Sequence, residues 1–141
     1  SINSFLSSKV IFFNELFKVF SNSGTEDNWK NFIEIIKNDK RIGNSHMQVP
    51  GPDGKLGFGG ACFPKDAQAL LQYSKDLDEP LKLLEKCISV NNNIRRQYNS
   101  LSKREAEQNI NFDSNIFSAG NILELNIAAA KQTKINGMPE K

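Results

Sequence analysis

Apolar residues recur at helical spacing along the first 21 residues, and they form two rows rather than one. One row is made of Leu6, Val10, Phe13, Phe17 and Phe20. The other is made of Phe5, Phe12, Leu16 and Val19. A helix that is apolar on two sides must be covered on two sides, which is difficult within 141 residues. We therefore expect a helix over residues 1–21 with a second subunit against one row.

The same segment carries a polar stripe and an abrupt start. At about 100° per residue, one narrow arc of the helix contains Asn3, Ser7, Asn14 and Lys18. The apolar pattern is already running at Ile2, which we interpret as the cut end of a longer helix.

A second helix is predicted to end near Asn38. Thr25 can cap it, and Glu26 and Asp27 suit its positive end. Its core face combines the i, i+3, i+4 and i+7 positions Trp29, Phe32, Ile33 and Ile36.

Residues 41–63 contain six glycines and two prolines and cannot be helical. A loop this long inside a domain is usually functional or disordered. Pro64 suits the first turn of a new helix that runs to about Leu77. Pro80 similarly opens a long helix that reaches Leu101, and a weaker helix at about 118–131 is followed by a tail. No useful strand-like alternation occurs, so the predicted fold class is all-α, a helical bundle with long helices.

Composition narrows the functional classes. Hydrophobic residues make up 38% of the chain and charged residues 24%, as in globular proteins. The net charge is +2 with both signs interspersed, which gives no electrostatic footprint for nucleic acid. The longest apolar runs are too short for a membrane span, and no leader pattern opens the chain. Two cysteines without CxxC spacing favour a reducing, cytoplasmic setting over a disulfide framework or zinc site.

The candidate chemistry centres on Cys62. It lies just before the helix predicted to start near residue 64, where free amides and the helix dipole favour a thiolate. Asp66 lies one turn further and can reach back toward the sulfur or a nearby water. Gly57, Gly59 and Gly60 let the backbone approach a ligand closely. This set suits covalent catalysis at a carbonyl carbon, and a buried cysteine beside a glycine turn is the alternative that spacing alone leaves open.

Other reactive side chains have simpler interpretations. Cys87 lies on an apolar helix face and is expected in the core. His46 is the only histidine, and we expect it at the surface. With no second histidine or paired carboxylates, no metal site is predicted.

The segment "GFGGACFPKD", residues 57–66, closely resembles the catalytic-cysteine motif of the UDP-glucose/GDP-mannose dehydrogenase family. The resemblance continues on both sides through "NSFLSSKVIFFNE", "DKRIGNSH", "DAQALLQYSKDL" and "SVNNNIR". These segments stand in family order and cover about residues 1–96. The chain therefore looks like the central, helical, dimer-forming domain of such an enzyme, a domain similar to the C-terminal domain of 6-phosphogluconate dehydrogenase.

The resemblance implies a reaction and roles for individual residues. Family enzymes oxidise the C6 alcohol of a nucleotide sugar twice with NAD, through a cysteine thiohemiacetal and thioester. Cys62 matches that cysteine, Asp66 the aspartate that positions or activates water, and Asn3 an asparagine that stabilises the oxyanion. Arg41 matches an arginine that reaches the neighbouring subunit's substrate. The loop around the sugar and nucleotide is matched by Gly57, Phe58, Gly59, Gly60, Phe63 and Lys65.

The departures from the family pattern are also specific. The family's catalytic lysine stands four residues before the matched asparagine, which for Asn3 falls ahead of residue 1. No GxGxxG follows a strand, so NAD is expected to bind a domain that precedes this chain. Residues 97–141 do not match the family's nucleotide-binding C-terminal domain, and "VPGPDGK", residues 49–55, lengthens the substrate loop.

Two functions from different classes follow. In the first, residues 1–141 are the central domain of an NAD-dependent oxidoreductase, inactive alone, with the missing domains cut away or supplied by another chain. In the second, the chain is a catalytically idle helical oligomerisation module that kept the motif.

Overall fold

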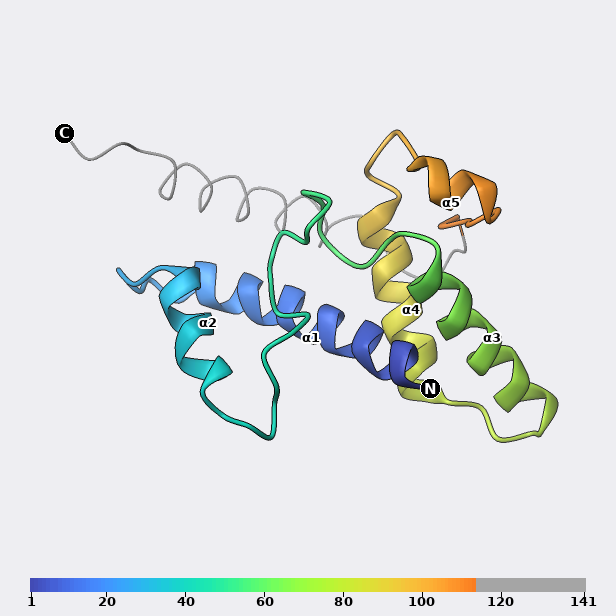
Figure 1. Cartoon of the computed structure of the whole chain (residues 1–141), viewed down its shortest axis with the longest axis horizontal. Helices are drawn as coiled ribbons and strands as arrows, with labels where there is room; N and C mark the ends of the chain where they lie inside the picture. The colour runs from blue at the N-terminus through green and yellow to red at the C-terminus, as the bar shows by residue number, and fades with distance from the viewer. Residues whose placement is uncertain (114–141) are drawn as a thin grey trace.

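The computed structural model describes residues 1–113, and these residues form helices and no strand (Figure 1). The helices are α1 (Ile2–Asn22), α2 (Trp29–Lys37), α3 (Cys62–Asp76), α4 (Lys82–Arg95) and α5 (Lys103–Glu107). The all-α prediction is therefore confirmed for this part of the chain, and none of these helices is long and apolar enough to cross a membrane. The helix predicted at 118–131 and the tail after it lie outside the described residues.

The long helix α1 organises the others. It contacts α2, α3 and α4, and α3 also contacts α4. In Figure 1, α2 lies beside the C-terminal half of α1, whereas α3 and α4 lie beside its N-terminal half. Phe17 of α1 is fully buried and its ring meets that of Trp29 of α2 edge to face, with the ring centroids 5.1 Å apart.

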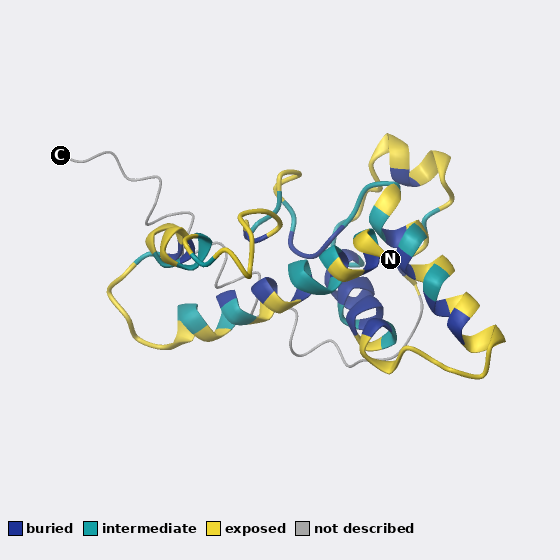
Figure 2. Ribbon diagram, turned by 60° about the horizontal axis from the view of Figure 1, so that its bottom comes forward, coloured by how far each residue is buried: buried dark blue, intermediate teal, exposed yellow. Residues whose placement is uncertain are grey.

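The two apolar rows of α1 have different surroundings. Phe13 and Phe17 of the first row are buried in the main core. In the second row, Phe5, Phe12 and Val19 are 69%, 60% and 66% exposed, whereas Leu16 is partly buried against the main core. Figure 2 shows exposed stretches along α1. Within residues 1–113, most of the second row is therefore left exposed.

The predicted boundaries need three corrections. Asn28, not Thr25, is the N-cap of α2, and its side chain accepts from the Asn31 amide. Cys62 is the first residue of α3 rather than a residue ahead of it. The helix predicted from Pro80 to Leu101 begins at Lys82 and ends at Arg95.

The early end of α4 has a visible reason. Past Arg95 the chain turns toward the glycine-rich loop, and the hydroxyl of Tyr98 accepts a hydrogen bond from the Leu56 amide at 2.9 Å. The guanidinium of Arg95 lies 5.8 Å from the centre of the Tyr98 ring. Tyr98 therefore binds the loop backbone instead of continuing the apolar face of α4.

Helix α2 offers a matched test of this fold. Ile33 is 5% exposed in the core, whereas Ile35 is 68% exposed on the same helix. Ile33→Ala should lower the free energy of unfolding by about 2–5 kcal/mol, because it removes buried methyl groups and leaves a cavity. Ile35→Ala should change it by about 0.5 kcal/mol or less. Urea unfolding measures both values, and a reversed order would show that α2 packs through its other face.

Candidate functional site

Residues 55–60 form an irregular loop between α1 and α4, and side chains from three helices hold its backbone. The amide of Gly57 donates to Asn14 Oδ1 at 3.0 Å, and that of Phe58 donates to Asn91 Oδ1 at 2.6 Å. Asn91 Nδ2 in turn donates to the Phe58 carbonyl at 2.9 Å. The amide of Gly60 donates to Glu105 Oε1 at 2.8 Å. Asn14 of the predicted polar stripe thus faces the loop.

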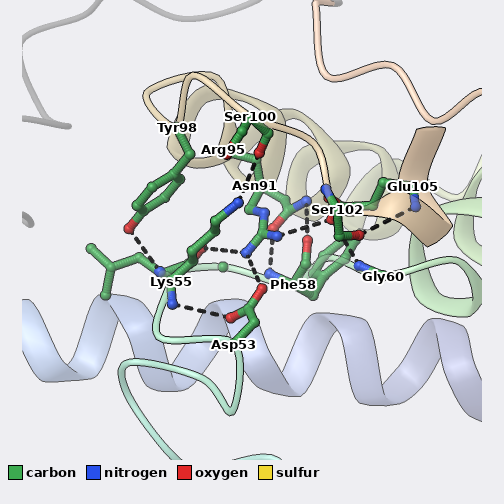
Figure 3. Close-up of polar contacts among 12 residues, drawn as sticks. Asp53, Lys55, Phe58, Gly60, Asn91, Arg95, Tyr98, Ser100, Ser102 and Glu105 are labelled. Atoms are coloured by element: carbon green, nitrogen blue, oxygen red, sulfur yellow. Dashed lines mark hydrogen bonds and ion pairs between the residues drawn. The ribbon is translucent and has the colours of Figure 1, made fainter.

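A buried ion pair lies behind this loop (Figure 3). Arg95 Nη2 donates to Glu105 Oε1 at 2.9 Å, and the two residues are 3% and 1% exposed. Arg95 Nη1 also donates to Asp53 Oδ2 at 2.8 Å, in the "VPGPDGK" segment. Ser102 and Glu105 form a capping box at the start of α5. The guanidinium and the carboxylate therefore both have several partners.

The electrostatics of Glu105 follow from these contacts. Burial by itself raises the pKa of this carboxyl group. Hydrogen bonds from the Ser102 and Gly60 amides and from the Ser102 side chain, together with the charge of Arg95, outweigh it and lower the pKa below its usual range. Glu105 is therefore an ionised acceptor at neutral pH.

Because Gly59 has no side chain, the ion pair of Arg95 and Glu105 can lie against its backbone. A Cβ atom at this position would overlap the Arg95 guanidinium and the Glu105 carboxylate. The second glycine of the motif is thus needed for close approach of backbone to side chains of the protein itself.

The three predicted catalytic residues lie at the junction of α1 and α3. Cys62 is exposed at the first residue of α3, and Asp66 follows one helical turn later. Asn3 Nδ2 of α1 donates to Asp66 Oδ2 at 2.6 Å, and Lys65 Nζ lies 3.2 Å from Asp66 Oδ1. The hydrogen bonds from Asn3 and then Lys65 lower the pKa of Asp66. Asp66 is thus suited to accept hydrogen bonds near neutral pH, rather than to act as a strong base.

A pocket of about 380 Å³ lies over the loop. Five of the residues predicted to bind substrate line it, namely Gly57, Phe58, Gly59, Gly60 and Phe63. Lys65 lies instead beside Asp66, and Arg41 is exposed and ion-paired with Asp39 at 2.6 Å. The structure therefore gathers the loop residues into one concave surface that Lys65 and Arg41 do not line.

Some residues around the loop were not predicted from the sequence. His46, expected at the surface, is exposed, but its ring also stacks on that of Phe63 with centroids 5.3 Å apart and lines the pocket. Asn91, Arg95 and Glu105 had no assigned role. For Glu105 the signal was present, because "SKRE" at residues 102–105 is a capping-box pattern. Within residues 1–113, no group of three His, Cys, Asp or Glu side chains could hold a metal ion.

The comparisons with known proteins agree with the motif. The model of the UDP-glucose/GDP-mannose dehydrogenase family, central domain, matches residues 1–93. The UDP-glucose 6-dehydrogenase of Rhizobium meliloti (strain 1021) is 37% identical over 94 residues, 67% of this chain and 20% of that protein. The UDP-glucose 6-dehydrogenase YwqF of Bacillus subtilis (strain 168) is 35% identical over 95 residues, 64% of this chain and 19% of that protein. The UDP-glucose 6-dehydrogenase of Rickettsia bellii (strain RML369-C) is 40% identical over 89 residues, 63% of this chain and 19% of that protein.

The chain thus spans about a fifth of the length of these curated relatives. No solved structure matches it.

The packing at Gly59 gives a prediction. Gly59→Ala should lower the free energy of unfolding by about 1–3 kcal/mol, because the added methyl group must displace the buried ion pair. Gly51→Ala is the matched control, since its Cβ would lie at an ordinary 3.4 Å from Asp53 Oδ1 and the Lys55 carbonyl. Urea unfolding of both variants compares them. Equal stability of the Gly59→Ala variant and the wild-type chain would contradict the close approach.

Proposed function

This chain belongs to the UDP-glucose/GDP-mannose dehydrogenase family, and on that premise we propose that it is the cysteine-bearing central part of a nucleotide-sugar 6-dehydrogenase. The substrate class would be a nucleotide sugar of the UDP-glucose type, which is the substrate in the names of its relatives. The observation that carries the proposal is the position of Cys62, exposed at the start of α3 with Asp66 one turn away and Asn3 bound to that carboxylate.

Each of these residues has a role in the second half of the reaction. The Cys62 thiolate adds to the carbonyl carbon of the C6 aldehyde, and the carbonyl oxygen takes up the negative charge. Asn3 lies beside Asp66, where a side-chain amide can donate to that oxygen. After oxidation to the thioester, a water held by Asp66 attacks the same carbon, and the uronate and the Cys62 thiol are released.

The two oxidations require a hydride acceptor that the described residues are not built to hold. Residues 1–113 contain no strand, and so no glycine-rich strand-to-helix turn that could bind the pyrophosphate of NAD. We therefore propose that NAD binds a separate domain of the whole enzyme, as the family resemblance implies. Residues 1–113 supply the nucleophile, the water-binding carboxylate and the loop.

The exposed row of α1 supports a second part of the proposal, a homodimer. Phe5, Phe12 and Val19 are exposed on α1 among the described residues, and burying such a row against a second copy would stabilise both copies. The competing function, an idle helical oligomerisation module, shares this surface and differs only at Cys62. The reactivity of Cys62 therefore discriminates between the two.

The first prediction here concerns that reactivity. Iodoacetamide at neutral pH should alkylate Cys62 about tenfold or more faster than Cys87, because Cys62 is exposed, whereas Cys87 is buried and burial raises its pKa. Peptide mass spectrometry over time assigns each site, with Cys62→Ser as control. Equal rates for the two cysteines in the folded chain would favour the idle module.

The second prediction concerns assembly. Sedimentation at micromolar concentration should give about twice the mass of the chain. Phe12→Arg should give a monomer, because it places a charge in the exposed row. Phe13, which belongs to the core row, is unsuitable for this test. Gln68→Arg adds the same charge on α3 and should leave the dimer intact. A monomeric wild-type chain would remove the homodimer from the proposal.

The third prediction concerns turnover. The chain alone should form no NADH from UDP-glucose and NAD over hours, because positioning of the reacting groups can supply about 7–11 kcal/mol of the barrier. Absorbance of NADH measures the rate. Turnover that disappears in the Cys62→Ser variant would show that the chain holds NAD after all.

A further inference from the structure

Glu105 lies outside the segment that matches the family, yet it contacts the cysteine loop directly. The match to the family model ends at residue 93. Glu105 Oε1 accepts both the Gly60 amide at 2.8 Å and Arg95 Nη2 at 2.9 Å. One carboxylate oxygen thus connects α5, α4 and the residue two positions before Cys62.

The stability of the fold alone does not explain the buried ion pair of Arg95 and Glu105. Taking both charges out of water costs desolvation energy, and well-packed apolar residues often stabilise a protein as much as a buried ion pair does. Apolar side chains cannot accept a hydrogen bond from the Gly60 amide. What the Glu105 carboxylate adds is a fixed position for this one amide.

That amide matters because the N-cap residue of α3 does not cap the helix with its side chain. Ala61 is the N-cap residue and provides no side-chain hydrogen bond, whereas Ser, Thr, Asp or Asn would cap the helix. Gly60 has φ +77°, a left-handed conformation that glycine adopts without strain. The first turn of α3, and with it Cys62, is therefore held through Gly60 as well as through the hydrogen bond from Asn3 to Asp66.

We propose that Glu105 is a positioning residue for Cys62, and that residues 96–113 act as a clamp that holds the glycine turn ahead of the nucleophile. The inference rests on the proposed role of Cys62. Arg95 orients the carboxylate of Glu105, and the amide and hydroxyl of Ser102 fix α5 through the capping box. The oriented carboxylate then accepts the hydrogen bond from the Gly60 amide.

The test uses the full 141-residue chain and the Glu105→Gln variant, which keeps the shape of the side chain and removes its charge. Hydrogen exchange of the Gly60 amide, followed by NMR, should become about tenfold faster, because the amide loses an ionised acceptor. The alkylation rate of Cys62 should change by about threefold, because the first turn of α3, where Cys62 lies, is held less firmly. Glu107→Gln is the matched control, since Glu107 lies on the same helix, half exposed and 3.9 Å from Lys103. It should change neither rate.

A second variant covers the case in which Glu105→Gln fails to fold. Ser102→Ala leaves the charges in place and weakens only the capping box that holds Glu105. It should also speed exchange at Gly60 and change the alkylation rate of Cys62, each by a smaller factor. Unchanged rates in a folded Glu105→Gln or Ser102→Ala variant, with Cys62 alkylated faster than Cys87 in the wild-type chain, would overturn this inference alone. Alkylation of Cys62 no faster than that of Cys87 in the wild-type chain would instead overturn the proposed function.

Discussion

Backbone that is buried outside a helix or strand must find hydrogen-bond partners elsewhere, and this requirement organises the centre of the protein. The loop that precedes Cys62 passes between helices, and its amides at Gly57, Phe58 and Gly60 are each taken by a side-chain oxygen. Those oxygens belong to Asn14, Asn91 and Glu105. Side chains from three helices, α1, α4 and α5, thereby hold the conformation of one short loop.

The same requirement accounts for two of the buried polar residues of α4, Asn91 and Arg95. Asn91, Asn92, Asn93 and Arg95 are all 5% exposed or less, although a helix interior favours apolar side chains at such positions. Asn91 contacts the loop with both its oxygen and its nitrogen. Arg95 donates hydrogen bonds to the carboxylates of Asp53 and Glu105. Through Asn91 and Arg95, α4 therefore supports the loop, although its Leu84 and Ile88 also pack in an apolar cluster with α3. The contact between α1 and α2 supplies much of the main apolar core.

Periodicity predicted the helices near residues 1–21 and 29–38, because each has an apolar face that packs locally, and Pro64 indicated the helix near 64–77. Periodicity failed after Arg95, where Tyr98 and Leu101 continue the spacing but the Tyr98 hydroxyl accepts a hydrogen bond from the Leu56 amide of the loop. For the site, the motif indicated Cys62 and Asp66, and the resemblance brought in Asn3, which the structure places against Asp66. The partners of the loop amides were not predictable, because spacing along one helix does not tell which distant backbone group faces an asparagine. The capping box of Ser102 and Glu105 could be recognised in the sequence. That Glu105 also accepts a hydrogen bond from the Gly60 amide could not.

The shared oxygen of Glu105 has a practical bearing on where this domain ends. A boundary set by sequence similarity would fall at residue 93. A shorter piece that ended soon after Arg95 would keep the guanidinium and its partly exposed partner Asp53 but lose the buried carboxylate of Glu105, and removing one partner of a buried ion pair is strongly destabilising. A stable piece of the chain should therefore include α5, which lies beyond the end of the family match.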